Sequence, residues 1–233
     1  MVGSGALFFR LSPGSGLVGD INDDLVNFYS ILRRDHRELY RALCCLPASR
    51  ATYYGLRASK DPLPFARAVR FAYLNRLCWN GLYRVNRSGQ FNVPIGDRLP
   101  HRMWFEDRLA QAADVLRRVT LASGDVENTL RHVRTGDLVY IDPPYRRGAA
   151  DALGFNRYHR VTFGLEDHLR IADSVRTLTR MRVKVMLTLG GSSRVLRLYP
   201  RSLNRLILTT TALISGNGNA RRAVREVVAR NYT

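Results

Sequence analysis

The run LVYIDPPY, residues 138–145, constrains the fold more than any other stretch of the chain. Its four apolar residues predict a buried strand. The two prolines after Asp142 end that strand, because each proline fixes φ at about −65° and removes a backbone donor. An aspartate at the carboxyl end of a parallel strand lies where open α/β sheets bind ligands. The run therefore favours an α/β fold with a ligand site at Asp142.

Further strands and helices are predicted in alternation along the chain. Residues 2–11 have the pattern of a glycine-rich turn followed by a short apolar helix, and residues 16–32 that of a strand ending at Asp20 and then a helix. The apolar spacing of residues 164–181 predicts an amphipathic helix. The remaining apolar runs predict a buried strand over residues 183–189 and a closing antiparallel pair over residues 205–214 and 223–232. We expect an α/β fold with a mixed, mostly parallel sheet.

The pattern changes between about residue 50 and residue 118. A helical stretch there is followed by NRSGQFNV, residues 86–93, which is typical of a hairpin turn between polar and aromatic strands. We therefore expect an inserted module. The predicted organisation is a catalytic domain of residues 1–52 and 119–233, interrupted by an inserted domain of residues 53–118 that contains helices and this hairpin.

The charge of the chain indicates a polyanionic partner. Its 37 basic and 19 acidic residues leave a formal charge of +18, which exceeds what solubility requires and favours nucleic acid as the partner. The three cysteines lack the spacing of a zinc site or a disulfide framework, so we expect no metal and a reducing cytoplasm. No stretch approaches the roughly 18 apolar residues of a membrane span, and no export signal is expected at the start.

The residues around Asp142 suit the binding of a primary amine. The carboxylate of Asp142 and the carbonyl of Pro143 can accept two hydrogens from one amino group, while Pro144 stiffens the loop and Tyr145 offers a flat face for a planar ring. A flipped nucleobase with an exocyclic amino group fits this arrangement. The alternative is structural: the prolines end a strand, Asp142 caps a turn and Tyr145 packs.

These residues carry a resemblance to a known family. The DPPY sequence after an apolar strand resembles the catalytic motif of amino-methylating DNA methyltransferases. Residues 74–96, LNRLCWNGLYRVNRSGQFNVPIG, are similar over their whole length to the signature of the Dam-like, D12-class adenine-specific enzymes. Four other blocks match in the same order: VGSGALFF, DINDDLVNFY, GFNRYHRVTFGLEDHLRIA and REVVARNY. The resemblance implies a Rossmann-like methyltransferase fold with an inserted DNA-recognition subdomain.

The resemblance also implies S-adenosylmethionine as the methyl donor. Glycines of the first block let the backbone approach the donor in such turns, and Asp20 lies where a carboxylate would accept both ribose hydroxyls. A helix cap is the alternative role of Asp20. The implied donor-binding residues are Gly3, Ser4, Gly5, Asp20, Asp125, Val126 and Asp142. In this family Asp142 and the Pro143 carbonyl would direct the amine of a flipped adenine toward the sulfonium methyl group.

The signature of residues 74–96, which includes this hairpin, is expected to read DNA. By resemblance, Trp79 and Asn80 would insert beside the site vacated by the flipped base, and Arg84 would bind the two major-groove acceptors of a guanine. The implied DNA-binding set is Trp79, Asn80, Leu82, Arg84, Asn86 and Pro94, with Leu82 and Pro94 against thymine methyls. These residues favour a GATC-type site. A solvated hairpin packed by its own aromatic side chains is the alternative.

The chain departs from the family at its start. Family members carry a lysine-, tryptophan- and glycine-rich block before the first turn, whereas this sequence begins at Met1 inside that turn, so the first strand is expected to be missing. The alternatives are an N-terminal truncation, a start that is called late, or another segment in place of that strand. Three functions remain open: an adenine methyltransferase, a catalytically impaired DNA-binding relative, and methylation of cytosine or RNA. Double-stranded DNA is the expected partner of a monomer. Whether a cognate restriction endonuclease acts separately is left open.

Overall fold

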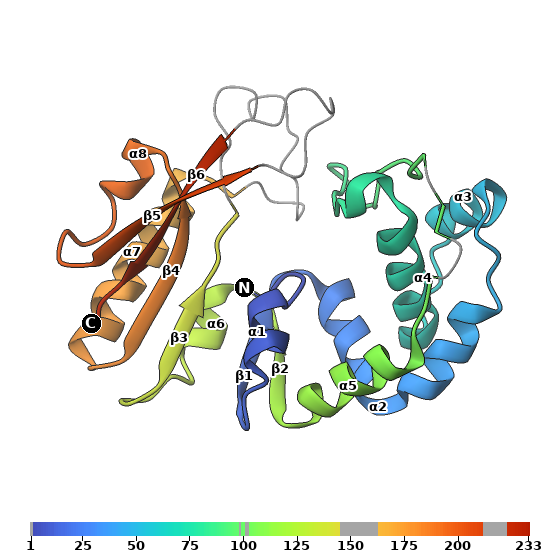
Figure 1. Cartoon of the computed structure of the whole chain (residues 1–233), viewed down its shortest axis with the longest axis horizontal. Helices are drawn as coiled ribbons and strands as arrows, with labels where there is room; N and C mark the ends of the chain where they lie inside the picture. Colours follow the sequence, from blue (N-terminus) through green and yellow to red (C-terminus); the bar gives the residue numbers. More distant parts are fainter. Residues whose placement is uncertain (1, 98, 101–102, 145–162, 212–222) are drawn as a thin grey trace. The chain divides into compact units, whose positions relative to one another are not determined.

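The computed structural model describes residues 2–97, 99–100, 103–144, 163–211 and 223–233, with side chains omitted at 210, 211, 223 and 224. Contacts between Cα atoms divide the chain into two compact units. One contains residues 2–129 and the other contains most of residues 130–233. Figure 1 labels the helices and strands of each unit.

The first unit begins with the expected turn, helix, strand and helix. Helix α1 (Ala6–Leu11) follows the glycine turn, β1 (Gly16–Asp20) ends at Asp20, and α2 (Asp23–Cys44) follows. Asn22, rather than Asp20, caps α2, because its side-chain oxygen accepts the backbone N–H groups of Asp24 and Leu25. The helix runs well past the expected end at residue 32, with a break in helical geometry at Asp35.

Three more helices build the core of this unit around α2. They are α3 (Arg50–Ala58), α4 (Pro64–Leu77) and α5 (Glu106–Arg117), and both α4 and α5 pack against α2. Helix α4 starts with a proline at its first position, where no intrahelical donor is lost. Fully buried side chains such as Leu39, Tyr53 and Tyr73 hold these helices together. Burial of such large apolar groups stabilises a fold by roughly 1.5–3 kcal/mol each.

A two-stranded parallel sheet completes the first unit. Strand β2 (Val119–Ser123) pairs with β1 in a register that places Asp20 opposite Ser123. Beyond the other edge of β1, the N–H of Val2 donates to the carbonyl of Gly19 at 3.0 Å. The short helix α6 (Val126–Leu130) follows β2. The carboxyl ends of both strands therefore lie at one edge, together with the glycine turn.

The second unit contains a four-stranded mixed sheet in the order β3-β4-β6-β5. Strands β3 (Leu138–Ile141) and β4 (Lys184–Gly190) are parallel, whereas β6 (Ala223–Arg230) runs antiparallel to β4 and to β5 (Asn204–Thr211). The expected closing antiparallel pair is confirmed as β5 and β6. Among the described strands, two pairings are parallel and two are antiparallel, whereas a mostly parallel arrangement was expected. The described strands form two sheets rather than the single sheet that was expected.

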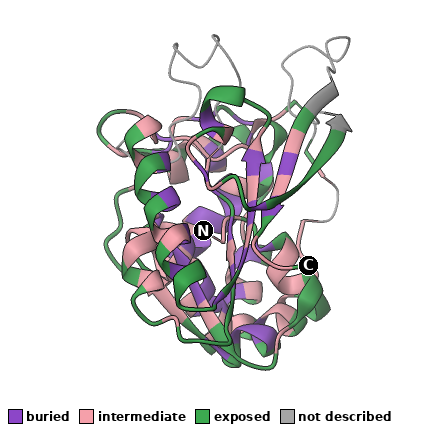
Figure 2. Ribbon diagram, turned by 90° about the vertical axis from the view of Figure 1, so that its left-hand side faces the viewer, coloured by how far each residue is buried: buried purple, intermediate pink, exposed green. Residues whose placement is uncertain are grey.

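Helix α7 (Leu165–Arg180) packs against β4, and the short helix α8 (Ser193–Leu196) follows that strand. Burial alternates along β4: Val185, Leu187 and Leu189 are buried, whereas Met186 and Thr188 are half-buried. This period of two follows from the pleat, which points successive side chains to opposite faces. Figure 2 shows the buried positions running along the strands and the inner sides of the helices. The less buried face of β4 carries Thr188, whose hydroxyl lies next to the end of β3.

Candidate active site and DNA-reading hairpin

Asp142 follows β3 directly, at the strand end where the sequence predicts it, and its side chain is exposed. The hydroxyl of Thr188 on β4 donates to its Oδ1 at 2.6 Å. The hydroxyl of Tyr140 lies 3.1 Å from the Thr188 hydroxyl oxygen. Burial is the main cause that raises the pKa of Tyr140, and the Asp142 and Glu226 carboxylates add to it. Sequence reasoning named Asp142 but missed both hydroxyl-bearing neighbours.

The loop after Asp142 is described only as far as Pro144. Pro143 is buried and Pro144 is half-buried, which suits a stiff segment with few backbone donors. Tyr145 lies outside the described residues. Four arginines further along the chain, Arg146, Arg147, Arg157 and Arg160, also lie outside the described residues.

The glycine turn of the first unit is held by two side chains. Its geometry requires glycine, since φ is 50° at Gly3 and 67° at Gly5. The Gly3 N–H donates to Asp20 Oδ2 at 2.9 Å, and the Tyr29 hydroxyl donates to the Gly3 carbonyl at 3.0 Å. Burial, together with the Asp20 carboxylate, raises the pKa of Tyr29, so this phenol remains a donor. Tyr29 is a residue that sequence reasoning missed.

Asp20 itself is only 3 % exposed. Its second oxygen, Oδ1, accepts the N–H of Asn22 at 2.9 Å. Each carboxylate oxygen therefore already holds one backbone hydrogen, which fixes the turn on one side and the start of α2 on the other. An oxygen that accepts one hydrogen still has a second acceptor position.

Asp125 and Val126 lie just after β2, at the same sheet edge as Asp20. The Gly124 N–H donates to the Asp20 carbonyl at 3.0 Å, which brings the two strand ends together. Asp125 Oδ1 accepts the N–H of Glu127, so this carboxylate also shapes the start of α6. Gly3, Gly5, Asp20 and Asp125 therefore gather at one edge of the β1–β2 sheet. Ser4 is exposed beside them.

The hairpin is tied to the helical core by its apolar residues. Val85, Phe91, Val93 and Ile95 are buried, and isolated bridges join Cys78 to Ile95 and Val85 to Phe91. The predicted hairpin is thus confirmed as a tight loop with single bridges rather than long strands. Asn86 shapes its turn, because its Oδ1 accepts the N–H groups of Ser88 and Gln90.

The residues expected to read DNA differ in exposure. Asn80 and Pro94 are exposed, whereas Trp79 and Leu82 are half-buried and packed against the core cluster. Asn80 has a φ of 51° and forms, with its neighbours, a short 3-10 turn η1 (Trp79–Gly81). The backbone of Trp79 donates to the Pro94 carbonyl at 3.0 Å. Trp79 and Pro94 therefore lie close together at the base of the hairpin.

Arg84 is held across the hairpin by Asn92. Its Nε–H donates to Asn92 Oδ1 at 2.8 Å, and one terminal nitrogen lies 3.4 Å from the Asn92 carbonyl oxygen. The backbone adds a third contact, from the Asn92 N–H to the Arg84 carbonyl. Arg84 is half-buried. Asn92, which sequence reasoning did not name, thus limits how the guanidinium can turn.

Part of the large positive charge stabilises the fold. Arg67 forms a forked ion pair with Asp24 at 2.6 and 3.1 Å, and Arg70 donates to the carbonyls of Leu56 and Arg57 at the end of α3. Arg67 and Arg70 are therefore bound within the protein, so part of its positive charge has a structural role that does not involve nucleic acid.

Burial, followed by the nearby Asp24 carboxylate, raises the pKa of the hairpin residue Tyr83 to about 12.

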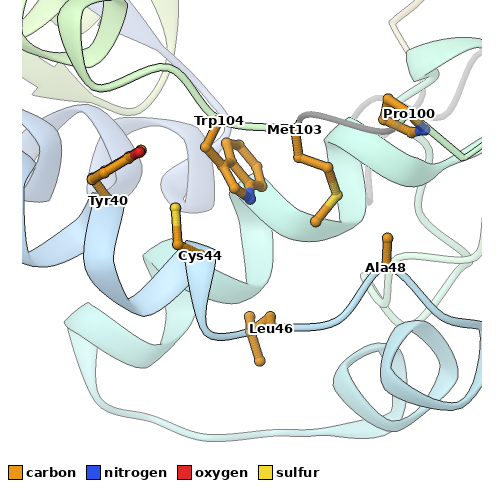
Figure 3. Close-up of a pocket in the computed structure, with 7 residues that line it drawn as sticks. All are labelled: Tyr40, Cys44, Leu46, Ala48, Pro100, Met103 and Trp104. Carbon is orange, nitrogen blue, oxygen red and sulfur yellow. The ribbon is translucent and has the colours of Figure 1, made fainter.

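A separate pocket of about 310 Å³ lies beside the end of α2 (Figure 3). It is lined by Tyr40, Cys44, Leu46, Ala48, Pro100, Met103 and Trp104. The buried indole nitrogen of Trp104 has no hydrogen-bond partner in the described part of the chain. None of the residues expected to bind donor or DNA lines this pocket, so it is distinct from the candidate site.

Over residues 2–97, 103–144 and 163–211, together with the shorter described stretches, no three His, Cys, Asp or Glu side chains gather as metal ligands would. Among the helices that the structure describes, none is both long and apolar enough to cross a membrane.

Comparison with known proteins gives a consistent result. The family model for D12 class N6 adenine-specific DNA methyltransferases matches residues 2–211. The chain is 30% identical to the Type II methyltransferase M1.LlaDCHI of Lactococcus lactis subsp. cremoris, over 99% of this chain and 84% of that protein. It is also 30% identical to the DNA adenine methylase of Escherichia coli K12, over 98% of this chain and 83% of that protein. The Type II methyltransferase M.MjaIII of Methanocaldococcus jannaschii is 28% identical over 99% and 86% of the two chains.

Proposed function

The chain belongs to the D12 class N6 adenine-specific DNA methyltransferase family, and we propose that it methylates the exocyclic amine of adenine at a GATC-type site in duplex DNA. The methyl donor is S-adenosylmethionine, and the target base is flipped out of the duplex. The observation that carries this proposal is the placement of Asp142: an exposed carboxylate at the carboxyl end of β3, held by Thr188 and followed by two prolines.

Asp142 and the Pro143 carbonyl act on the amine of the flipped base. That amine is a weak nucleophile because its lone pair is delocalised into the ring. Two acceptors that receive its hydrogens orient the amino group and localise the lone pair. Positioning of this kind can contribute about 7–11 kcal/mol to lowering a barrier. Tyr145 provides the stacking face for the base.

The glycine turn and the carboxyl ends of strands β1 and β2 carry groups that can bind the methyl donor. Gly3 has a positive φ, and a Cβ there would meet nothing within 4 Å, so open space lies beside the backbone. Gly3, Ser4 and Gly5 let the backbone approach the donor, Asp20 accepts ribose hydroxyls, and Asp125 and Val126 bind its adenine. The donor supplies an activated methyl group on a sulfonium, so the protein's own share is alignment and electrostatics.

The hairpin recognises the target sequence. Trp79 and Asn80 enter at the flipped base, Leu82 and Pro94 contact thymine methyls, and Arg84 binds a guanine. Asn86 shapes the turn beside them. The support for this assignment is the exposure of Asn80 and Pro94 at the hairpin base and the fixed guanidinium of Arg84. A bidentate arginine contact of this kind is worth about 1–3 kcal/mol of discrimination.

The domain organisation follows from these roles. A Rossmann-like catalytic domain comprises residues 1–52 and 119–233, and residues 53–118 form the target-recognition domain. The enzyme acts as a cytoplasmic monomer. Two of the relatives are named Type II methyltransferases, and a restriction-modification role would pair this enzyme with an endonuclease that acts separately on the same site.

A transfer assay with radiolabelled S-adenosylmethionine tests the proposal. Duplex DNA with one GATC site should gain label in N6-methyladenine, identified by hydrolysis and chromatography. A matched duplex whose target adenines are already N6-methylated should gain none. Label in cytosine, preferential labelling of RNA, or no transfer by protein that binds the donor would each contradict the proposed reaction. Absent donor binding in calorimetry would instead select a DNA-binding relative without activity.

A further inference from the structure

The strand register brings three polar side chains together on one face of the second sheet. Tyr140 and Asp142 are two residues apart on one extended segment, so they point to the same face. The β3–β4 register pairs Ile141 with Leu187, and its continuation by one residue places Asp142 opposite Thr188. The measured contacts follow this geometry, at 2.6 Å from Thr188 to Asp142 and 3.1 Å from Tyr140 to Thr188.

The chemistry of these groups fixes the direction of both hydrogen bonds. An ionised carboxylate accepts only, so the single hydroxyl proton of Thr188 points to Asp142. The Thr188 oxygen can then act only as an acceptor toward Tyr140, and the phenol must donate. The raised pKa of Tyr140, caused chiefly by burial, keeps that proton on the phenol at neutral pH. The three groups therefore form an ordered chain from Tyr140 through Thr188 to Asp142.

We infer that Thr188 and Tyr140 are positioning residues that fix the orientation of the Asp142 carboxylate toward the substrate amine. This inference rests on the proposed function. Asp142 lies at the surface of its unit, and the terminal torsion of an aspartate side chain has a broad energy minimum, so a fixed donor helps to define its orientation. A strong hydrogen bond from a strand residue preorganises the acceptor before substrate arrives.

Replacement of Thr188 by valine tests the first bond of the chain. Valine has nearly the same shape and favours strands, but it has no proton to donate. We expect Thr188→Val to lower kcat by about 10- to 100-fold, the usual cost of losing a hydrogen bond to a charged group. The KM values for DNA and donor should change by less than about threefold. Thr188→Ser, which keeps the hydroxyl, should retain kcat to within about threefold.

A double-mutant cycle tests the chain as a unit. We expect Tyr140→Phe alone to lower kcat by about 3- to 10-fold. In the Thr188→Val background the same change should have no further effect, because the phenol acts only through the threonine hydroxyl. Tyr232→Phe is the matched control: the hydroxyl of Tyr232 lies 3.8 Å from the sulfur of Met186 on β4, and its loss should leave kcat unchanged. Additive effects of Tyr140→Phe and Thr188→Val would overturn the inference.

The experiments distinguish a failure of the positioning role from a failure of the proposed methyl-transfer reaction. Transfer by the wild type together with unchanged kcat in Thr188→Val would refute the positioning role and leave the reaction intact. If the wild type transfers no methyl group, the proposed reaction is wrong, and the double-mutant cycle is then measured as changes in Tm. Non-additive shifts in Tm would then support the hydrogen-bonded chain, whereas additive shifts would overturn it.

Discussion

Asn92 holds the guanidinium of Arg84 across the hairpin, with its Oδ1 2.8 Å from Arg84 Nε. This contact restrains the side chain that we propose reads a base, through an oxygen that only accepts hydrogen bonds. An arginine held in one orientation discriminates between bases better than a mobile one, because a bidentate contact depends on the planar fork.

We predict that Asn92→Ala relaxes specificity at the base pair that Arg84 reads. The ratio of kcat/KM for GATC to that for a duplex altered at this guanine should fall by about 5- to 50-fold, within the 1–3 kcal/mol range of such contacts. Asn92→Asp keeps the acceptor and should retain the ratio. Equal ratios in wild type and Asn92→Ala would mean that Arg84 does not depend on Asn92 for reading.

The sequence could predict the placement of Asp142 and Asp20 because Asp20 ends one apolar strand and Asp142 follows another, and strand ends are marked locally by a proline pair or by the start of a helix. It also predicted the hairpin, from its glycine and asparagine residues. The position of Thr188 opposite Asp142 could not be predicted. It depends on a strand register across 46 residues, which no local pattern specifies.

The spacing of apolar residues also could not predict which side chains form hydrogen bonds with which backbone groups. Asp20 and Asn22 are both reasonable caps by residue type, and only the backbone path shows that Asn22 caps α2 while Asp20 bridges the glycine turn to it. Tyr29 looked like one more apolar residue of a helix. Its hydroxyl contact with Gly3 becomes visible only when the turn folds back over α2.

Asp20→Asn should weaken both the turn and donor binding. The amide has one acceptor oxygen instead of two, so either the Gly3 or the Asn22 N–H faces an NH₂ group. We expect the free energy of unfolding to fall by about 1–3 kcal/mol and the Kd for S-adenosylmethionine to rise at least tenfold in calorimetry. Asp23→Asn removes the same charge from a neighbouring exposed position and is the control. An unchanged Kd in Asp20→Asn would remove this residue from the donor site.

The two glycines of the turn should respond differently to alanine. At Gly5 a Cβ would lie 2.7 Å from the Phe9 ring and the φ is 67°, so Gly5→Ala combines a clash with backbone strain of about 1–2 kcal/mol. At Gly3 only the strain applies, because the space is open. We therefore expect a larger drop in Tm for Gly5→Ala. Gly3→Ala should instead show its main effect in weaker donor binding, and equal Tm losses would contradict this reading of the turn.

Binding to duplex DNA should depend steeply on salt. With a formal charge of +18, the protein should contact several phosphates, and each contact contributes about −0.9 to the slope of log K against log salt. We expect affinity for a GATC duplex to fall by about 10³-fold or more as salt rises from roughly 50 to 200 mM. Fluorescence anisotropy over this range measures the slope, and a nearly flat line would mean that the charge serves the fold alone.

The most direct test of the central claim is methyl transfer by Asp142→Ala under single-turnover conditions, with wild type measured beside it. We expect the variant to lose at least about 10³-fold in rate, a loss within the range that alignment supplies. Its affinity for GATC duplex should stay within about threefold of wild type. A variant that still methylates adenine at a rate near that of wild type would contradict the assignment of Asp142 as the residue that binds the amine.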